Sequence, residues 1–211
     1  MKKTRIAALV SGGGTNLQAL IDAQMRGELG GGEIVAVISS KPGAYALERG
    51  GKVGIPGYVL DRKTFPDNRS MTVALVEKLK QLQIDLVVLA GCMVIFTNEL
   101  VEAYPNAVIN VHPALIPSFC GPGYYGLHVH EKALAYGVKL SGATVHFVNE
   151  ECDGGPIIAQ KAVEVKWDDT PEVLQKRIME QAEWKILPEA VSLFCQGRLH
   201  VEGRTVVVEE R

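Results

Sequence analysis

The sequence predicts an α/β protein built on a doubly wound, mostly parallel sheet. Three observations lead to this fold class. Short apolar segments alternate with helical patterns in the order βαβαβαβαβ, a glycine cluster follows the first apolar segment, and the last third alternates apolar and polar residues. Compact apolar segments are typical of buried parallel strands, whereas alternation is typical of antiparallel strands. We therefore expect a parallel half followed by an antiparallel extension.

The parallel half contains strands joined by helices. The strands are expected at 5–10, 33–39, 57–60, 85–90 and 107–111. The helices are expected from the apolar positions around Leu17 onward, and at 44–52, 67–83 and 98–104. Helix 67–83 has the clearest pattern, because its apolar residues recur three positions apart with charged residues between them.

The final third adds two strands, a long helix and a hairpin. Residues 144–148 and 157–165 are predicted to be antiparallel strands, 171–193 one long helix, and 198–208 a hairpin that turns near Gly203. No repeat, low-complexity segment or linker interrupts the pattern. Residues 1–211 are therefore expected to form a single domain.

Composition and charge exclude several classes of protein. The 211 residues include 22 Lys and Arg against 24 Asp and Glu, and 47% are hydrophobic, which is typical of a globular chain. Without a basic surplus, nothing favours nucleic-acid binding. The longest apolar run, 86–96, is shorter than the ~20 residues that span a bilayer, and the apolar stretch 6–10 is too short for a secretory signal. We expect a cytoplasmic protein that binds neither nucleic acid nor membrane.

A glycine-rich loop lies between the first predicted strand and the first helix. It runs Ser11-Gly12-Gly13-Gly14-Thr15-Asn16. Glycines allow backbone N–H groups to approach an anion closely, and the N-terminus of the following helix adds its positive dipole. The loop matches neither a Walker motif nor a dinucleotide fingerprint, because position 17 is Leu. It is predicted to bind a single phosphate, with a merely tight turn as the alternative.

Asn110, His112 and Asp153 are the candidates for catalysis. Asn110 and His112 point to the same side of the last parallel strand, at its carboxyl end, where an amide donor and an imidazole can hold a developing oxyanion. Asp153 lies in the glycine-rich turn 152–156, which could bring its carboxylate to His112. Such a partner would raise the pKa of the histidine and keep it cationic. The alternatives are a structural histidine and an ordinary Asx turn.

The remaining histidines and the cysteines are interpreted as structural. His128 and His130 lack further metal ligands, His146 is either core or site wall, and His200 is expected to be exposed. The run 121–126 is interpreted as a mobile loop beside His112. The four cysteines form no C-x-x-C pair and are expected to be reduced and mostly buried.

Four motifs in this order resemble the phosphoribosylglycinamide formyltransferases. They are SGGGTNLQA at 11–19, LAGCM at 89–93, NVHPALIP at 110–117 and DGGPII at 153–158. The resemblance covers essentially the whole chain. It implies a Rossmann-like formyltransferase fold and transfer of a formyl group from 10-formyltetrahydrofolate to 5-phosphoribosylglycinamide. It implies no metal and no covalent intermediate, and it leaves monomer and homodimer open.

The resemblance also implies roles for individual residues. Asn110 would donate to the oxyanion, cationic His112 would act as general acid, and Asp153 would orient His112. The ribonucleotide would be held by Gly13, Gly14, Thr15, Asn16 and Glu183. The folate would be held by Arg69, Met93, Val94, Ile95, Phe96 and Asn110. Two departures stand out: Val94 replaces an arginine frequent in the family, and the loop 118–126 is longer than in many relatives.

Three other functions are considered. A methionyl-tRNA formyltransferase would need a basic tRNA-binding domain, which the charge balance does not favour. A formyltetrahydrofolate hydrolase would carry an extra N-terminal domain, for which a first strand at Arg5 leaves no room. A catalytically idle phosphate-sugar binding module would leave His112 and Asp153 structural, which their joint occurrence with Asn110 makes an unsatisfactory explanation.

Overall fold

The computed structural model describes residues 3–210 and contains a nine-stranded sheet in the order β3-β2-β1-β4-β5-β6-β7-β9-β8. The strands are β1 (Thr4–Val10), β2 (Gly32–Ser39), β3 (Gly57–Val59), β4 (Leu86–Leu89), β5 (Val108–His112), β6 (Leu140–Phe147), β7 (Ile157–Glu164), β8 (Leu199–Glu202) and β9 (Thr205–Val208). Strands β3 to β5 pair in parallel, and β6 joins β5 antiparallel. The predicted parallel half and antiparallel extension are confirmed.

Helices cover both faces of the sheet. They are α1 (Thr15–Met25), α2 (Tyr45–Lys52), α3 (Asn68–Gln81), α4 (Asn98–Ala103), α5 (Leu127–Tyr136), α6 (Pro171–Ile178) and α7 (Trp184–Cys195). Ile6, Ala8 and Val10 of β1 share a core with α1, α6 and α7, whereas Ala7 and Leu9 share a second core with α3 and α4. One strand therefore supplies two cores, because successive side chains point to opposite faces.

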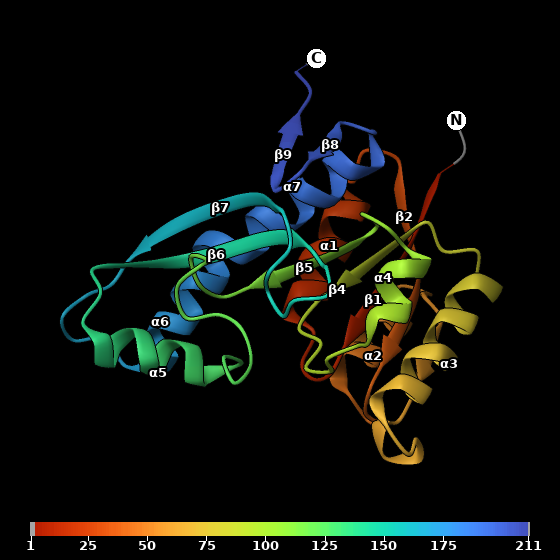
Figure 1. The fold of residues 1–211 in the computed structure, drawn as a ribbon, viewed down its shortest axis with the longest axis horizontal. Coiled ribbons are helices and arrows are strands. Elements are labelled where there is room, and N and C mark those ends of the chain that lie inside the picture. Colours follow the sequence, from red (N-terminus) through yellow and green to blue (C-terminus); the bar gives the residue numbers. More distant parts are fainter. Residues whose placement is uncertain (1–2, 211) are drawn as a thin grey trace.

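The antiparallel half extends sideways from the parallel half (Figure 1). Strand β7 pairs with β6 along its length, and the β8–β9 hairpin attaches to β7 through the single pair Ile157↔Thr205. The hairpin turns at Gly203, as predicted. Helix α5 lies below the far end of β6 in this view and packs against α6.

Two elements differ from the sequence-based expectation. No helix is predicted at 127–136, where α5 forms between Gly126 and Gly137, because its inward face is small and includes a histidine. The long helix expected at 171–193 forms as a continuous helical run over 171–195, but a π-helical segment, η2 (Met179–Glu183), lies between α6 and α7. Such π turns are rare and occur frequently at functional sites. A short 3-10 turn, η1 (Arg62–Thr64), precedes α3.

Within residues 3–210, no helix is both long and apolar enough to cross a membrane.

Candidate active site

A cavity of about 620 Å³ opens at the carboxyl ends of the parallel strands. Because β1 lies between β2 and β4, the chain reverses its direction of winding here, and such switch points are where doubly wound sheets bind ligands. The antiparallel half supplies the opposite wall. The lining includes Glu183 and the segments 12–16, 89–98, 110–113, 121–126 and 148–153.

The glycine loop presents unpaired backbone donors to this cavity. Gly14 has a left-handed φ of 71° at the N-cap of α1, and a Cβ added there would lie 2.6 Å from Cβ of Ala46. Only glycine therefore fits at this position. The backbone N–H groups of Gly12, Gly13 and Gly14 donate to no acceptor among residues 3–210. The loop has the donors that a phosphate needs.

Asn110 and His146 form a cross-strand pair beside Asp153. The two residues are directly opposite in the β5–β6 ladder. His146 Nδ1 donates to the Phe147 carbonyl oxygen at 2.8 Å, and Nε2 lies 3.1 Å from the amide nitrogen of Asn110. The same amide nitrogen donates to Asp153 Oδ1 at 3.4 Å. His146 thus belongs to the site wall, one of the two alternatives that the sequence leaves open.

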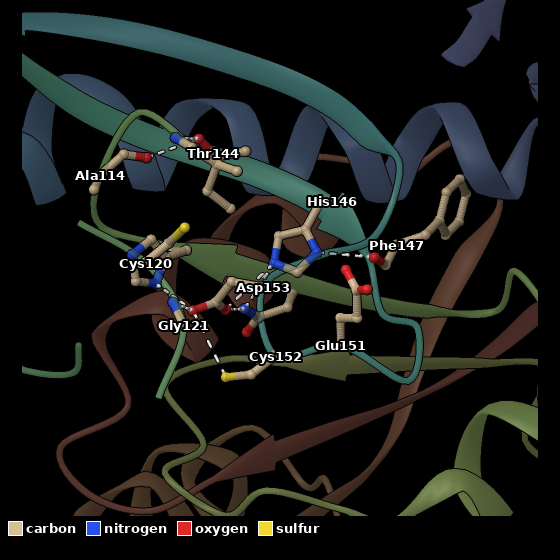
Figure 2. A network of polar contacts seen from close by, with 12 residues as sticks. Ala114, Cys120, Gly121, Thr144, His146, Phe147, Glu151, Cys152 and Asp153 are labelled. Carbon is tan, nitrogen blue, oxygen red and sulfur yellow. Dashed lines mark hydrogen bonds and ion pairs between the residues drawn. The ribbon is translucent and has the colours of Figure 1, made fainter. Parts of the chain in front are cut away.

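The turn between β6 and β7 folds inward and brings Asp153 to His112. Gly155 packs directly on the Phe147 backbone, where a side chain would collide with the carbonyl oxygen, and Asp153 itself adopts a left-handed φ of 55°. Asp153 Oδ2 lies 3.5 Å from His112 Nδ1 and accepts the Gly121 N–H at 2.9 Å. Figure 2 shows the carboxylate between the loop of Gly121 and the strand of His146. The proximity that the sequence leaves undecided is present.

Burial and the neighbouring carboxylate act on the pKa of His112 in opposite directions. The side chain is buried, and burial lowers its pKa below the usual 6.5, although Asp153 and the Phe119 carbonyl act to raise it. Asp153 therefore acts on the pKa of His112 in the predicted direction, but desolvation of the ring is the larger effect and the pKa lies below its usual value. Nε2 of His112 donates to the Phe119 oxygen at 2.8 Å.

Asp153 itself is ionised at neutral pH. Burial acts to raise the pKa of its carboxyl, but the contacts with His146, His112 and the Gly121 N–H together hold this pKa below its usual value. A neutral imidazole beside a buried carboxylate can accept a proton and form a stabilised ion pair.

Glu183 lies at the other end of the cavity. The π turn η2 directs this buried side chain toward α1, where Asn16 Nδ2 donates to Oε2 at 2.6 Å. Burial raises the pKa of Glu183 to about 7, and the Asn16 contact opposes this shift. Oδ1 of Asn16 is buried without a partner within the described part of the chain. The pair therefore offers acceptors to a ligand that carries hydroxyl or amine groups.

Most of the residues expected to hold the folate line the cavity, but Arg69 does not. Met93, Val94, Ile95 and Phe96 line the cavity after β4. Arg69 does not line it: its side chain on α3 is 76% exposed and forms an ion pair with Glu99 of α4. Tyr124 and Tyr125 in the loop 121–126, and Gln175 and Met179 on α6 and η2, also line the cavity. The sequence analysis identifies that loop but does not name these four residues as site residues.

His130 and Cys152 also line the cavity, and their surroundings differ from one another. His130 is buried at the cavity wall, with neither ring nitrogen partnered inside residues 3–210, and burial lowers its pKa to about 4. Cys152 is exposed next to Asp153, in the surface turn 149–156, and the other three cysteines are only partly buried, so the expectation of mostly buried cysteines is wrong. All four cysteines are free thiols. No group of three or more His, Cys, Asp or Glu in residues 3–210 is placed to hold a metal ion.

Comparisons with known proteins identify the family to which the chain belongs. The model of the formyl transferase family matches residues 4–191. A phosphoribosylglycinamide formyltransferase of Haemophilus influenzae is 41% identical over 209 residues, which is 99% of this chain and 94% of that protein. The crystal structure of glycinamide ribonucleotide transformylase 1 from Symbiobacterium toebii matches 99% of this chain and 95% of that chain, at 42% identity and a TM-score of 0.93.

An enzyme of a different activity shares the fold. A formyltetrahydrofolate deformylase from Pseudomonas syringae is 30% identical with a TM-score of 0.87, and the match covers 99% of this chain and 66% of that chain. The fold and site therefore define a protein that handles a formyl group. The chain belongs to the formyl transferase family, and its close relatives are phosphoribosylglycinamide formyltransferases.

Proposed function

We propose that this protein transfers the formyl group of 10-formyltetrahydrofolate to the primary amine of 5-phosphoribosylglycinamide. The products are formylglycinamide ribonucleotide and tetrahydrofolate, a step of purine biosynthesis. The observation that supports this most directly is one continuous cavity, which joins a loop of unpaired backbone donors to the Asn110–His112–Asp153 cluster. One bound substrate can therefore place its phosphate at the loop and its amine at this cluster.

His112 moves the proton in the proposed reaction. The substrate amine attacks the formyl carbon, a C–N bond forms, and the amine proton passes to the neutral imidazole of His112. The resulting imidazolium lies next to the Asp153 carboxylate, 3.5 Å away. It then returns the proton toward N10 as the bond from N10 to the formyl carbon breaks. A lowered pKa favours this use of His112 first as a base and then as an acid.

Asn110 stabilises the oxyanion of the tetrahedral intermediate. Its amide donors face His146 and Asp153 in this conformation, and the contact with Asp153 is the longer one at 3.4 Å. We expect that contact to be exchanged for the developing oxyanion while His146 continues to hold the amide. One such donor contributes on the order of 10²–10³ in rate.

The two substrates occupy opposite ends of the cavity. Gly13, Gly14 and Thr15 hold the phosphate at the N-terminus of α1, and Asn16 with Glu183 hold the ribose. Met93, Val94, Ile95 and Phe96 contact the folate through apolar surface, and Met93 and Ile95 are more than half exposed in the described conformation. The reach of Arg69 to the folate tail stays a prediction that would require its ion pair with Glu99 to open.

Acceptor-dependent turnover tests the proposal. The purified protein is mixed with 10-formyl-5,8-dideazafolate or the natural cosubstrate, and deformylation is followed by absorbance with and without phosphoribosylglycinamide. Turnover that requires the acceptor supports the transferase. Deformylation at an equal rate without acceptor would instead identify a hydrolase like the Pseudomonas relative, and no reaction in either case would favour a binding module.

Four expectations from the sequence stay predictions. They concern the single domain 1–211, a monomer or homodimer, a cytoplasmic location and catalysis without a metal.

A further inference from the structure

Helix α2 holds the back of the glycine loop through two consecutive carbonyl groups. The backbone N–H of Ala46 donates to the Gly12 oxygen at 3.1 Å. Nε of Arg49 donates to the next carbonyl, that of Gly13, at 2.7 Å. A second nitrogen of the same guanidinium donates to Oε1 of Gln18, on the first turns of α1, at 3.0 Å. Arg49 therefore connects α2, the loop and α1.

The peptide geometry links these carbonyl groups to the donors on the other side of the loop. In a trans peptide the C=O of one residue and the N–H of the next lie in one plane and point in opposite directions. When the Gly12 and Gly13 oxygens face α2, the N–H groups of Gly13 and Gly14 must face away from it. These N–H groups are unpaired within the described residues, and both glycines line the cavity.

The arginine is suited to this position by its shape as well as its charge. Its planar guanidinium can donate to two acceptors in a fixed geometry, which a lysine ammonium cannot reproduce. The guanidinium also lies 5.0 Å from the ring centroid of Tyr45, which restricts its motion. Arg49 does not line the cavity, so it acts from behind the loop.

We propose that Arg49 is a positioning residue for phosphate recognition: by holding the Gly13 carbonyl and Gln18, it keeps the N–H group of Gly14 directed at the phosphate of the acceptor substrate, beside the Gly13 N–H that the Ala46 contact orients. This proposal rests on the proposed function, because it takes the loop as the phosphate site. Without the arginine, the Gly13–Gly14 peptide can rotate and its donor is lost to the ligand. Binding of the folate, at the other end of the cavity, is unaffected.

Three variants and two acceptors test this role. Arg49→Met removes the donors, Arg49→Lys keeps the charge without the fork, and Lys52→Met removes a cation from the same helix that contacts only Tyr45. KM and kcat are measured with phosphoribosylglycinamide and with its dephosphorylated riboside at saturating folate. Thermal unfolding and KM for the folate report whether each variant is folded.

Arg49→Met is expected to raise KM for the phosphorylated acceptor about 10- to 100-fold, the range of a hydrogen bond from a charged donor. Its kcat and its KM for folate stay at the parent values, and kcat/KM for the riboside is unchanged. Arg49→Lys is expected to follow Arg49→Met, and Lys52→Met to follow the parent. If Arg49→Lys keeps the parent KM, the residue acts only as a charge and the positioning role is wrong.

A binding measurement separates this proposal from the proposed function. Calorimetric titration with ribose 5-phosphate needs no turnover. If the parent transfers no formyl group but Arg49→Met still weakens ribose 5-phosphate binding about tenfold or more, the function fails and the positioning role stands. Equal losses for the riboside and the ribonucleotide, or equal ribose 5-phosphate affinity in parent and Arg49→Met, would overturn the positioning role.

Discussion

Asp153 and Glu183 are acidic side chains that line the same cavity, yet their pKa values move in opposite directions. Burial acts to raise the pKa of both. Asp153 lies among the Gly121 N–H, the Asn110 amide, His112 and His146, and its pKa falls below the usual value. Glu183 has the single Asn16 donor, and its pKa rises to about 7. Glu183 is the more deeply buried of the two and has fewer contacts that favour the charged form, and both differences act in the same direction.

His130 extends this comparison to a group with no partner at all. It is buried, and neither of its ring nitrogens has a hydrogen-bond partner within residues 3–210. Burial and the nearby His112 lower its pKa to about 4. Burial favours the neutral form of all three groups, and among the three the neighbouring contacts outweigh burial at Asp153 alone. The ionised group is the one next to the catalytic histidine.

The largest expected effect comes from removing the charge of Asp153. Asp153→Asn should lower kcat by about 10³-fold, because the imidazolium of His112 loses its counter-charge in a buried site. Steady-state kinetics with both substrates measures this loss. Asp168→Asn, at an exposed position, serves as the matched control and should behave as the parent. A kcat within threefold of the parent would show that Asp153 is not needed for proton transfer.

The next effect concerns stability and comes from Glu183→Gln. The folded carboxyl has a pKa of about 7 against 4.5 for an ordinary Glu, so the folded state binds more protons between these values and stability falls as pH rises through them. The penalty above pH 7 is on the order of 3 kcal/mol. Glu183→Gln has no such ionisation, keeps an acceptor for Asn16, and should gain stability relative to the parent between pH 5 and pH 8.

Chemical denaturation of parent and Glu183→Gln at both pH values checks this result. A difference in unfolding free energy that stays constant from pH 5 to pH 8 would mean that Glu183 is already ionised at pH 5. In that case the Asn16 donor is sufficient to keep the Glu183 carboxyl ionised, and the contrast with Asp153 disappears.

The effect of His130→Leu on the free energy of unfolding should depend on pH in the opposite sense and should be smaller. The unfolded histidine takes up a proton below about pH 6.5, whereas the folded one stays neutral to about pH 4, so the parent loses stability as pH falls through this range. At pH 5 the loss is about 2 kcal/mol. The leucine variant avoids it and should become more stable than the parent at pH 5 relative to pH 8. A pH-independent difference would indicate that the folded His130 finds a partner.

The smallest effect tests the single donor directly. Asn16→Ala removes the contact that opposes the shift of Glu183, so the pKa of this carboxyl should rise above that of the parent. Carbonyl-detected NMR of the Glu183 carboxyl follows this titration in both proteins. An unchanged titration midpoint would show that the Asn16 contact does not affect the pKa of Glu183 and that burial alone sets it.

Much of the fold follows from local patterns. The strands of the parallel half are predictable because each apolar segment is followed by a helical pattern. The turns at Gly14 and Gly203 require glycine at positive φ. The pairing of Asn110 with His112 is predictable, since the two residues alternate on one strand, whereas the approach of Asp153 depends on the inward turn between β6 and β7. Helix α5 and the π turn are not predictable, because neither has a strong periodicity of its own and packing against α6 and β6 stabilises them.

By itself the sequence determines most of the order of strands and helices, and it predicts an anion-binding glycine loop and the residues proposed for the reactive cluster. These properties depend on neighbours a few positions away along the chain. The tertiary structure alone decides that His112 is neutral, that Glu183 is protonated until about pH 7, that Arg69 pairs with Glu99, and that Arg49 supports the glycine loop. These depend on how much water is excluded and which groups converge from distant segments, and only packing sets both.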